Sequence, residues 1–128
     1  MLSRKSILAA VFSLTVCTLA AAQSSALPTE LKGSWFWAEQ NLSQIFSLSA
    51  IKATSPEVAT ATLTWWTANT KCALREVPIE LRTTETTIAF DATTKCDVSF
   101  TAELTKTPGG WKGKAVVKQG PVVELSAR

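Results

Sequence analysis

Apolar and polar side chains alternate along most of this chain after residue 30, with a period of two residues. The pattern is clearest in residues 97–105, where the apolar positions are Val98, Phe100, Ala102 and Leu104 and the polar ones are Ser99, Thr101, Glu103 and Thr105. Successive side chains of a β-strand point to opposite faces, whereas a helix would repeat about every 3.6 residues. The alternation therefore predicts half-buried strands with one face toward a core and the other toward water.

The same alternation predicts eight short strands, which cover residues 33–39, 44–52, 58–67, 73–82, 86–91, 97–105, 110–118 and 121–127. Pro and Gly residues that favour turns separate several of them, as in residues 106–110 and 119–121. Short turns between consecutive strands indicate an antiparallel meander. A meander of this size can close into a barrel, which removes its exposed edges. We therefore expect an all-β fold, a small up-and-down β-barrel, with a two-sheet β-sandwich as the alternative.

Pro78 lies in the middle of the fourth predicted strand, residues 73–82. Proline has no backbone N–H and cannot donate a hydrogen bond to a neighbouring strand. A bulge or a local opening of the barrel is therefore expected beside this residue.

Residues 1–22 have the three parts of a secretory signal: basic Arg4 and Lys5, an apolar run, and a small-residue end at residues 20–22. Cys17 would permit a lipid anchor, but the branched Val16 precedes it where such a signal has a small residue. We expect cleavage after Ala22 and a periplasmic or secreted protein. Removing 22 of the 128 residues leaves 106, which suits one β domain over residues 31–128, preceded by a tail and turn at 23–30.

Without Cys17 the exported chain keeps two cysteines, Cys72 and Cys96. Paired thiols normally oxidise outside the cytoplasm, so a disulfide is predicted. The two are 24 positions apart, unlike the Cys-x-x-Cys spacing of redox pairs. Closing a loop of this length stabilises a fold by about 3 kcal/mol, so the predicted role is structural.

The exported chain is close to neutral, because loss of Arg4 and Lys5 reduces the 13 basic residues to 11, against 10 acidic ones. Such a balance gives no reason to expect nucleic acid or a stable insertion into membranes. Lys112, Lys114 and Lys118 fall on one face of a predicted strand. They could meet an anionic polymer, although lysines on an outward face also keep a sheet soluble.

The chain contains no histidine, which excludes Ser-His-Asp triads and the commonest zinc ligands. Glu76 and Glu80 share one face of a strand but stand roughly 13 Å apart, too far for paired acid–base work. We therefore expect no enzyme activity, no cofactor and no metal.

The chain has five tryptophans, residues that serve both as core fillers and as binding surfaces. By parity Trp35, Trp37, Trp65 and Trp111 belong to the inward faces of their strands. Trp66 and Phe36 fall on the opposite faces and are the predicted surface binding residues.

Residues 31–35, Leu-Lys-Gly-Ser-Trp, resemble the first strand of the calycin barrels, the lipocalins and avidins, where a Gly-x-Trp follows a short turn. Residues 27–30 match that turn, and Arg128 matches a basic residue that packs near the tryptophan in those families. The resemblance implies an up-and-down barrel with a ligand mouth. It does not imply biotin binding.

These observations indicate a non-catalytic binding protein that acts as a monomer. Its ligand is either a small apolar molecule held inside the barrel or an exported protein held at the surface, for instance a hydrolase that it inhibits. Small inward residues would leave room for a ligand, and they are Ala59, Ala61, Ala102, Gly113 and Ala115. Residues 41–43 match an N-glycosylation acceptor sequence at Asn41.

Overall fold

The computed structural model describes residues 27–128, and the signal sequence expected over residues 1–22 lies outside that range. In chain order the elements are β1 (Leu31–Trp37), η1 (Ala38–Gln40), β2 (Leu42–Ala53), β3 (Val58–Trp65), η2 (Thr70–Cys72), β4 (Leu74–Thr83), β5 (Thr87–Thr93), β6 (Ser99–Thr107), β7 (Gly110–Val117) and β8 (Val122–Ala127). The two η elements are single turns of 3-10 helix. Every strand begins and ends within two residues of the bounds that the alternation predicts.

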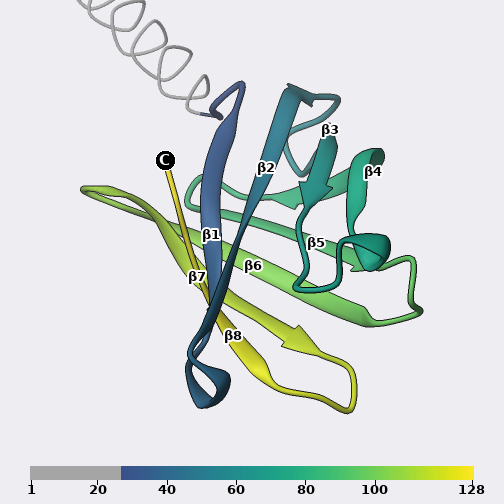
Figure 1. Cartoon of the computed structure of the whole chain (residues 1–128). Coiled ribbons are helices and arrows are strands. Elements are labelled where there is room, and N and C mark those ends of the chain that lie inside the picture. The colour runs from purple at the N-terminus through teal and green to yellow at the C-terminus, as the bar shows by residue number, and fades with distance from the viewer. Residues whose placement is uncertain (1–26) are drawn as a thin grey trace, which may run out of the picture.

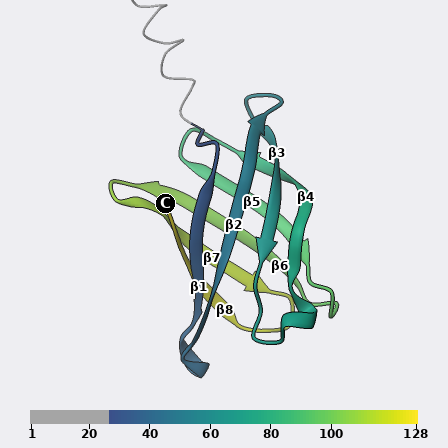
Figure 2. The same ribbon diagram turned by 45° about the horizontal axis from the view of Figure 1, so that its top comes forward.

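The eight strands form one closed barrel in which each strand is antiparallel to its neighbours in the chain. Figure 1 shows the strands following one another around the barrel, and Figure 2 shows the same order from a turned view. The last strand returns to the first, where Gly33 pairs with Ala127 and Trp35 with Leu125. The predicted up-and-down barrel is confirmed, and the two-sheet sandwich is excluded.

The closure between β1 and β8 depends on a glycine. A Cβ atom placed on Gly33 would lie 2.2 Å from the backbone oxygen of Ser126 and 2.7 Å from the Cβ of Ala127. Any larger residue would push the two strands apart at this point. The tight packing of β1 on β8 therefore follows from the sequence at position 33.

The apolar face of each strand points into the barrel. The largest fully buried side chains are Phe90, Leu31, Leu48, Leu63, Leu81, Ile88 and Leu104. One inward prediction is wrong: Val98 is 42% exposed, because it precedes β6 in a loop and does not share the alternation of the strand.

The seam between β4 and β5 is only partly paired. Thr83 donates its backbone N–H to the carbonyl of Glu57, on the β3 side. Alternate residues of a strand direct their backbone groups to opposite sides, so Arg82, Glu80 and Pro78 direct theirs toward β5. Pro78 has no N–H to offer there. The predicted opening of the barrel beside Pro78 is confirmed, because β4 pairs with β5 only through Arg82 and Thr83.

A bulge at Glu76, two residues before Pro78, also interrupts the regular pairing of β4. The pairing of β3 with β4 shifts between Leu63 and Trp65. Opposite this shift Glu76 has a φ of 51° and donates its backbone N–H to the Thr64 hydroxyl, 3.2 Å away. A bulge of this kind turns the strand locally. Pro78 and the bulge together keep β4 from following β5.

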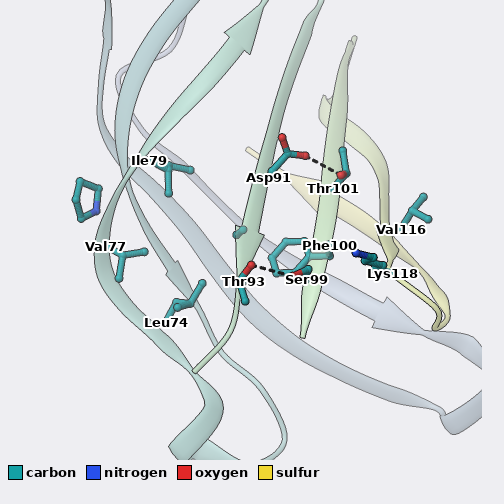
Figure 3. Close-up of a pocket in the computed structure, with 12 residues that line it drawn as sticks. Leu74, Val77, Ile79, Asp91, Thr93, Ser99, Phe100, Thr101, Val116 and Lys118 are labelled. Carbon is teal, nitrogen blue, oxygen red and sulfur yellow. Dashed lines mark hydrogen bonds between the residues drawn. The ribbon is translucent and has the colours of Figure 1, made fainter. Parts of the chain in front are cut away.

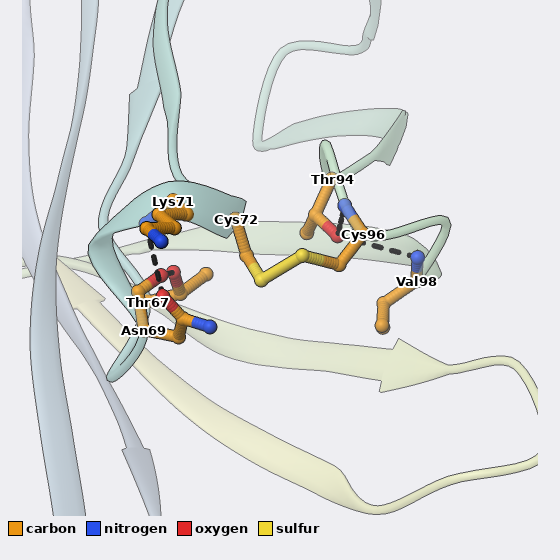
Figure 4. The surroundings of a disulfide bond; sticks show 7 residues. All are labelled: Thr67, Asn69, Lys71, Cys72, Thr94, Cys96 and Val98. Carbon is orange, nitrogen blue, oxygen red and sulfur yellow. Dashed lines mark hydrogen bonds between the residues drawn. A yellow bond between two sulfur atoms is a disulfide. The ribbon is translucent and has the colours of Figure 1, made fainter.

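The predicted disulfide between Cys72 and Cys96 is confirmed, with Cα atoms 5.0 Å apart. It ties the loop before β4 to the loop after β5 (Figure 4). The Lys95 N–H also donates to the Cys72 carbonyl, at 3.1 Å. The open seam is therefore closed at both ends, by strand pairing at one and by this link at the other.

Candidate functional site

A cavity of about 280 Å³ opens at the end of the barrel that carries the disulfide. Its wall is almost wholly apolar and includes three indole rings and a phenyl ring, those of Trp35, Trp37, Trp65 and Phe100. A small apolar cavity with few polar groups is the usual form of a site for a small molecule. The interior is therefore not completely filled by side chains at this end.

Trp35 and Trp65 form the fixed side of the cavity. Their rings are stacked, with centroids 5.9 Å apart and planes 6° from parallel. The Trp35 indole N–H donates to the Trp66 carbonyl at 2.8 Å, which links β1 to the end of β3. The ring of Phe100 lies 4.4 Å from that of Trp65. These contacts fix the aromatic wall on this side, and the Trp35 donor is satisfied.

Trp37 forms the other side and differs from its neighbours in one respect. Within residues 27–128, its Nε1 is the one buried side-chain nitrogen or oxygen that has no hydrogen-bond partner. A buried donor left without an acceptor costs about 1–3 kcal/mol, so such groups are uncommon and call for an explanation. Less than 1 Å² of this atom is exposed, so an acceptor in the cavity would reach it only after the indole ring turns.

The rim of the cavity is held by short-range hydrogen bonds as well as by the disulfide (Figure 4). The Asn69 side chain accepts from the Lys71 N–H, and the Thr67 hydroxyl donates to the Asn69 carbonyl. On the other loop the buried Thr94 hydroxyl accepts from the backbone N–H of Val98 at 3.2 Å. Both loops line the cavity, so its mouth has a defined shape.

The two residues predicted as surface contacts, Trp66 and Phe36, do not line this cavity. Both are half-buried on the outside of the barrel. The guanidinium of Arg75 lies 4.9 Å from the centre of the Trp66 ring, and the backbone N–H of Trp66 donates to the backbone carbonyl of Ile45. Trp66 is thus less exposed than its parity alone predicts, because a neighbouring side chain covers it.

Sequence reasoning missed two features of the site. The first is Ile45, an apolar residue that is 61% exposed on the strand between those of Phe36 and Trp66. The alternation could have revealed it, because Ile45 directly precedes the inward Phe46 and must therefore point outward. Trp37 was predicted as core, and it is half-buried against the core instead. No sequence pattern marks its indole as lacking an acceptor, because that depends on the three-dimensional packing of the β1–β2 hairpin.

A second and larger cleft, of about 820 Å³, lies over the open seam. Figure 3 shows Val77 and Ile79 of β4 on one side, Asp91 of β5 in the middle and Lys118 on the other side. The hydrogen bond from Arg82, followed by one from Thr101, holds the pKa of the Asp91 carboxyl below its usual value. This cleft is open to water.

Other predicted groups lie apart from both hollows or only at their edges. Arg128 has an exposed side chain and pairs through its backbone with Lys32, while the ring of Trp35 packs on Trp65. Lys114 lies opposite Glu103 and Glu124 on the neighbouring strands.

In the part of the chain from residue 27 onward, no three His, Cys, Asp or Glu side chains are grouped so that they could hold a metal ion. None of the helices in that part is long and apolar enough to span a membrane. The sequence matches no protein-family model, and no curated protein is significantly similar to it.

Proposed function

We propose that this chain is an exported, non-catalytic binding protein whose ligand is a small apolar molecule with one hydrogen-bond acceptor. The observation that carries the proposal is the buried Nε1 of Trp37, which has no hydrogen-bond partner and belongs to a residue that lines an apolar cavity; a ligand would reach it when the indole ring turns. The disulfide supports a compartment outside the cytoplasm, since such bonds persist in oxidising surroundings. The apolar wall would bind the body of the ligand, and Trp37 would orient it.

The size of the cavity bears on the ligand. At about 280 Å³ it lies near the lower end of the range for small-molecule sites. A compact ring or a short branched chain fits such a volume better than a large cofactor. The indole rings of Trp35 and Trp65 form part of the apolar wall that such a ring would contact.

Two probes of matched shape test this proposal, cyclohexanone and methylenecyclohexane, which differ by a carbonyl oxygen in place of a methylene. We expect cyclohexanone to bind about tenfold more tightly, because only its oxygen satisfies the Trp37 donor. Titration followed by NMR should shift the indole N–H resonance of Trp37 with cyclohexanone alone. Trp37→Phe should abolish the difference between the two probes.

Trp111→Phe is the matched control, since Trp111 is 7% exposed and does not line the cavity. It should leave the preference for cyclohexanone intact. If neither probe binds at millimolar concentration, or if both bind equally to the unmodified protein, the proposed site is wrong.

A second candidate function is the docking of an exported protein on the outer patch, which we define as Phe36, Ile45 and Trp66. The observation in its favour is the 61% exposure of Ile45 beside two half-buried aromatic rings. Large exposed hydrophobic residues next to aromatic ones are typical of interaction surfaces. A photo-crosslinker placed at position 45 should then capture one specific exported protein, and Trp66→Ala should abolish the capture.

If Trp66 serves in docking and not in holding the fold together, its removal should destabilise the protein much less than removal of Trp65. Trp65→Ala should lower the free energy of unfolding by about 3–5 kcal/mol, because Trp65 packs on three other aromatic rings. Trp66→Ala should cost about 1 kcal/mol, because only the stacking with Arg75 and partial burial are lost. A urea titration of each variant measures both values.

A further inference from the structure

The cleft over the open seam has an apolar floor. Leu74 is buried there, and Val77, Ile79 and Ala92 are half-buried. Figure 3 shows the side chains of Leu74, Val77 and Ile79 turned toward the strand that carries Asp91. An apolar surface that is half open to water gains free energy when an apolar group covers it.

One residue joins this cleft to the tryptophan cavity. Phe100 lines both hollows, and no other residue does. Its ring lies 4.4 Å from that of Trp65 on the cavity side and 6.3 Å from that of Phe90. The floor of the cleft and the wall of the cavity are therefore neighbouring surfaces with one aromatic ring between them.

A β-strand is a poor occupant of the cleft. The edge of β4 that faces it presents Arg82, Glu80 and Pro78 in alternation, and Arg82 is already paired with Ala89. Pro78 has no N–H, so an added strand would lack a hydrogen bond in the middle of this edge. A hydrocarbon chain needs no such bond. The single carboxylate among the residues that line the cleft, Asp91, is paired with Arg82 at 2.8 Å.

We propose that the seam cleft is a second compartment of the ligand site, and that the ligand is a compact ring bearing an acceptor with an alkyl chain attached. The ring occupies the tryptophan cavity, and the chain passes Phe100 to lie on the floor formed by Val77 and Ile79. This inference rests on the proposed function. It adds the class of ligand and gives a role to the opening beside Pro78.

The test compares cyclohexanone with 2-propylcyclohexanone and 2-hexylcyclohexanone by calorimetric titration of the full exported chain. Each methylene that reaches the apolar floor should tighten binding by about two- to fourfold. Val77→Asp should remove this gain, because a carboxylate then lies on the floor, while the affinity for cyclohexanone itself stays unchanged. Retained cyclohexanone binding also shows that the variant is folded.

Val122→Asp is the matched control, since Val122 is 51% exposed and lines neither hollow. It should keep the full gain from the chain. If cyclohexanone binds but the chain adds nothing, or if Val77→Asp keeps the gain because the chain leaves through the barrel mouth, the two-compartment site is refuted and the inner site stands. If cyclohexanone itself does not bind, the proposed function fails and this inference fails with it.

Discussion

Two seams of this barrel differ in how the sequence treats the approach of neighbouring strands. At the β1–β8 seam Gly33 lets the strands come so close that even a methyl group would collide with Ser126. At the β4–β5 seam Pro78 withholds a hydrogen-bond donor, and only Arg82 and Thr83 of β4 are paired. The β1–β8 seam is closed because Gly33 has no side chain, and the β4–β5 seam is kept open because Pro78 has no N–H.

The two seams differ in how much of their stability comes from backbone hydrogen bonds. The β1–β8 seam has a continuous ladder of backbone pairs from Gly33 to Phe36, although Trp35 of β1 and Val123 of β8 also line the tryptophan cavity. The β4–β5 seam replaces part of that ladder with a covalent link between Cys72 and Cys96. A strand that is tied at its ends does not need to be paired along its middle, and the middle is where we propose that the alkyl chain of the ligand lies.

Of the changes at the two seams, breaking the disulfide at the open seam is expected to have the largest effect. Replacing both Cys72 and Cys96 by serine should lower the free energy of unfolding by about 3 kcal/mol, because the unfolded chain is no longer constrained. Denaturant unfolding with and without a reductant measures it. Reduction of the unmodified protein should give a similar loss, and an unchanged midpoint in both experiments would show that the link does not hold the seam.

A smaller loss is expected at the closed seam. Gly33→Ala should cost about 1–3 kcal/mol, because its Cβ would lie 2.2 Å from a backbone oxygen that cannot move without shifting β8. Gly109→Ala is the control, since a Cβ there meets nothing within 4 Å and should change stability by less than about 0.5 kcal/mol. Equal thermal midpoints for the two variants would contradict the close approach.

Much of the fold was predictable because its signal is local. The period of two marks each strand directly. The two cysteines predict the disulfide, and Pro78 predicts the missing backbone hydrogen bond. The length of the opening was not predictable, since it also depends on the bulge at Glu76, whose φ of 51° has no signature in the sequence. Val98 was misplaced for a similar reason, because the alternation runs past the point where the strand begins.

The candidate site was harder to predict than the fold. Sequence parity correctly placed Trp35 and Trp65 on the inward face, but it cannot say whether inward residues fill the interior or surround a hollow. That depends on the summed volume of side chains from many strands. Parity favoured Trp66 and Phe36 as contacts, and whether they serve in binding stays a prediction.

A near-neutral change is expected when the donor is restored at the open seam. Pro78→Val should change the free energy of unfolding by less than about 1 kcal/mol, since it gains a β-former but alters the bulged strand. Hydrogen exchange should show the new amide at position 78 protected, with β4 drawn toward β5. Pro108→Val, in an exposed turn, controls for the loss of proline rigidity. An amide at position 78 that exchanges freely would show that the bulge alone keeps the seam open.

The smallest effect concerns the ion pair beside the seam, between Arg82 and Asp91 at 2.8 Å. The hydrogen bond from Arg82 lowers the pKa of Asp91, so the folded chain keeps this carboxylate ionised at a lower pH than the unfolded chain does. The stabilisation is therefore present above about pH 4 and is lost as the pH falls through the folded pKa. Both side chains are more than half exposed, which limits the effect to under about 1 kcal/mol. Asp91→Asn should lower stability slightly at pH 7 and not at pH 2, and a double-mutant cycle with Arg82→Gln in urea isolates the pair. A coupling energy that is the same at both pH values would show that the carboxylate charge has no part in it.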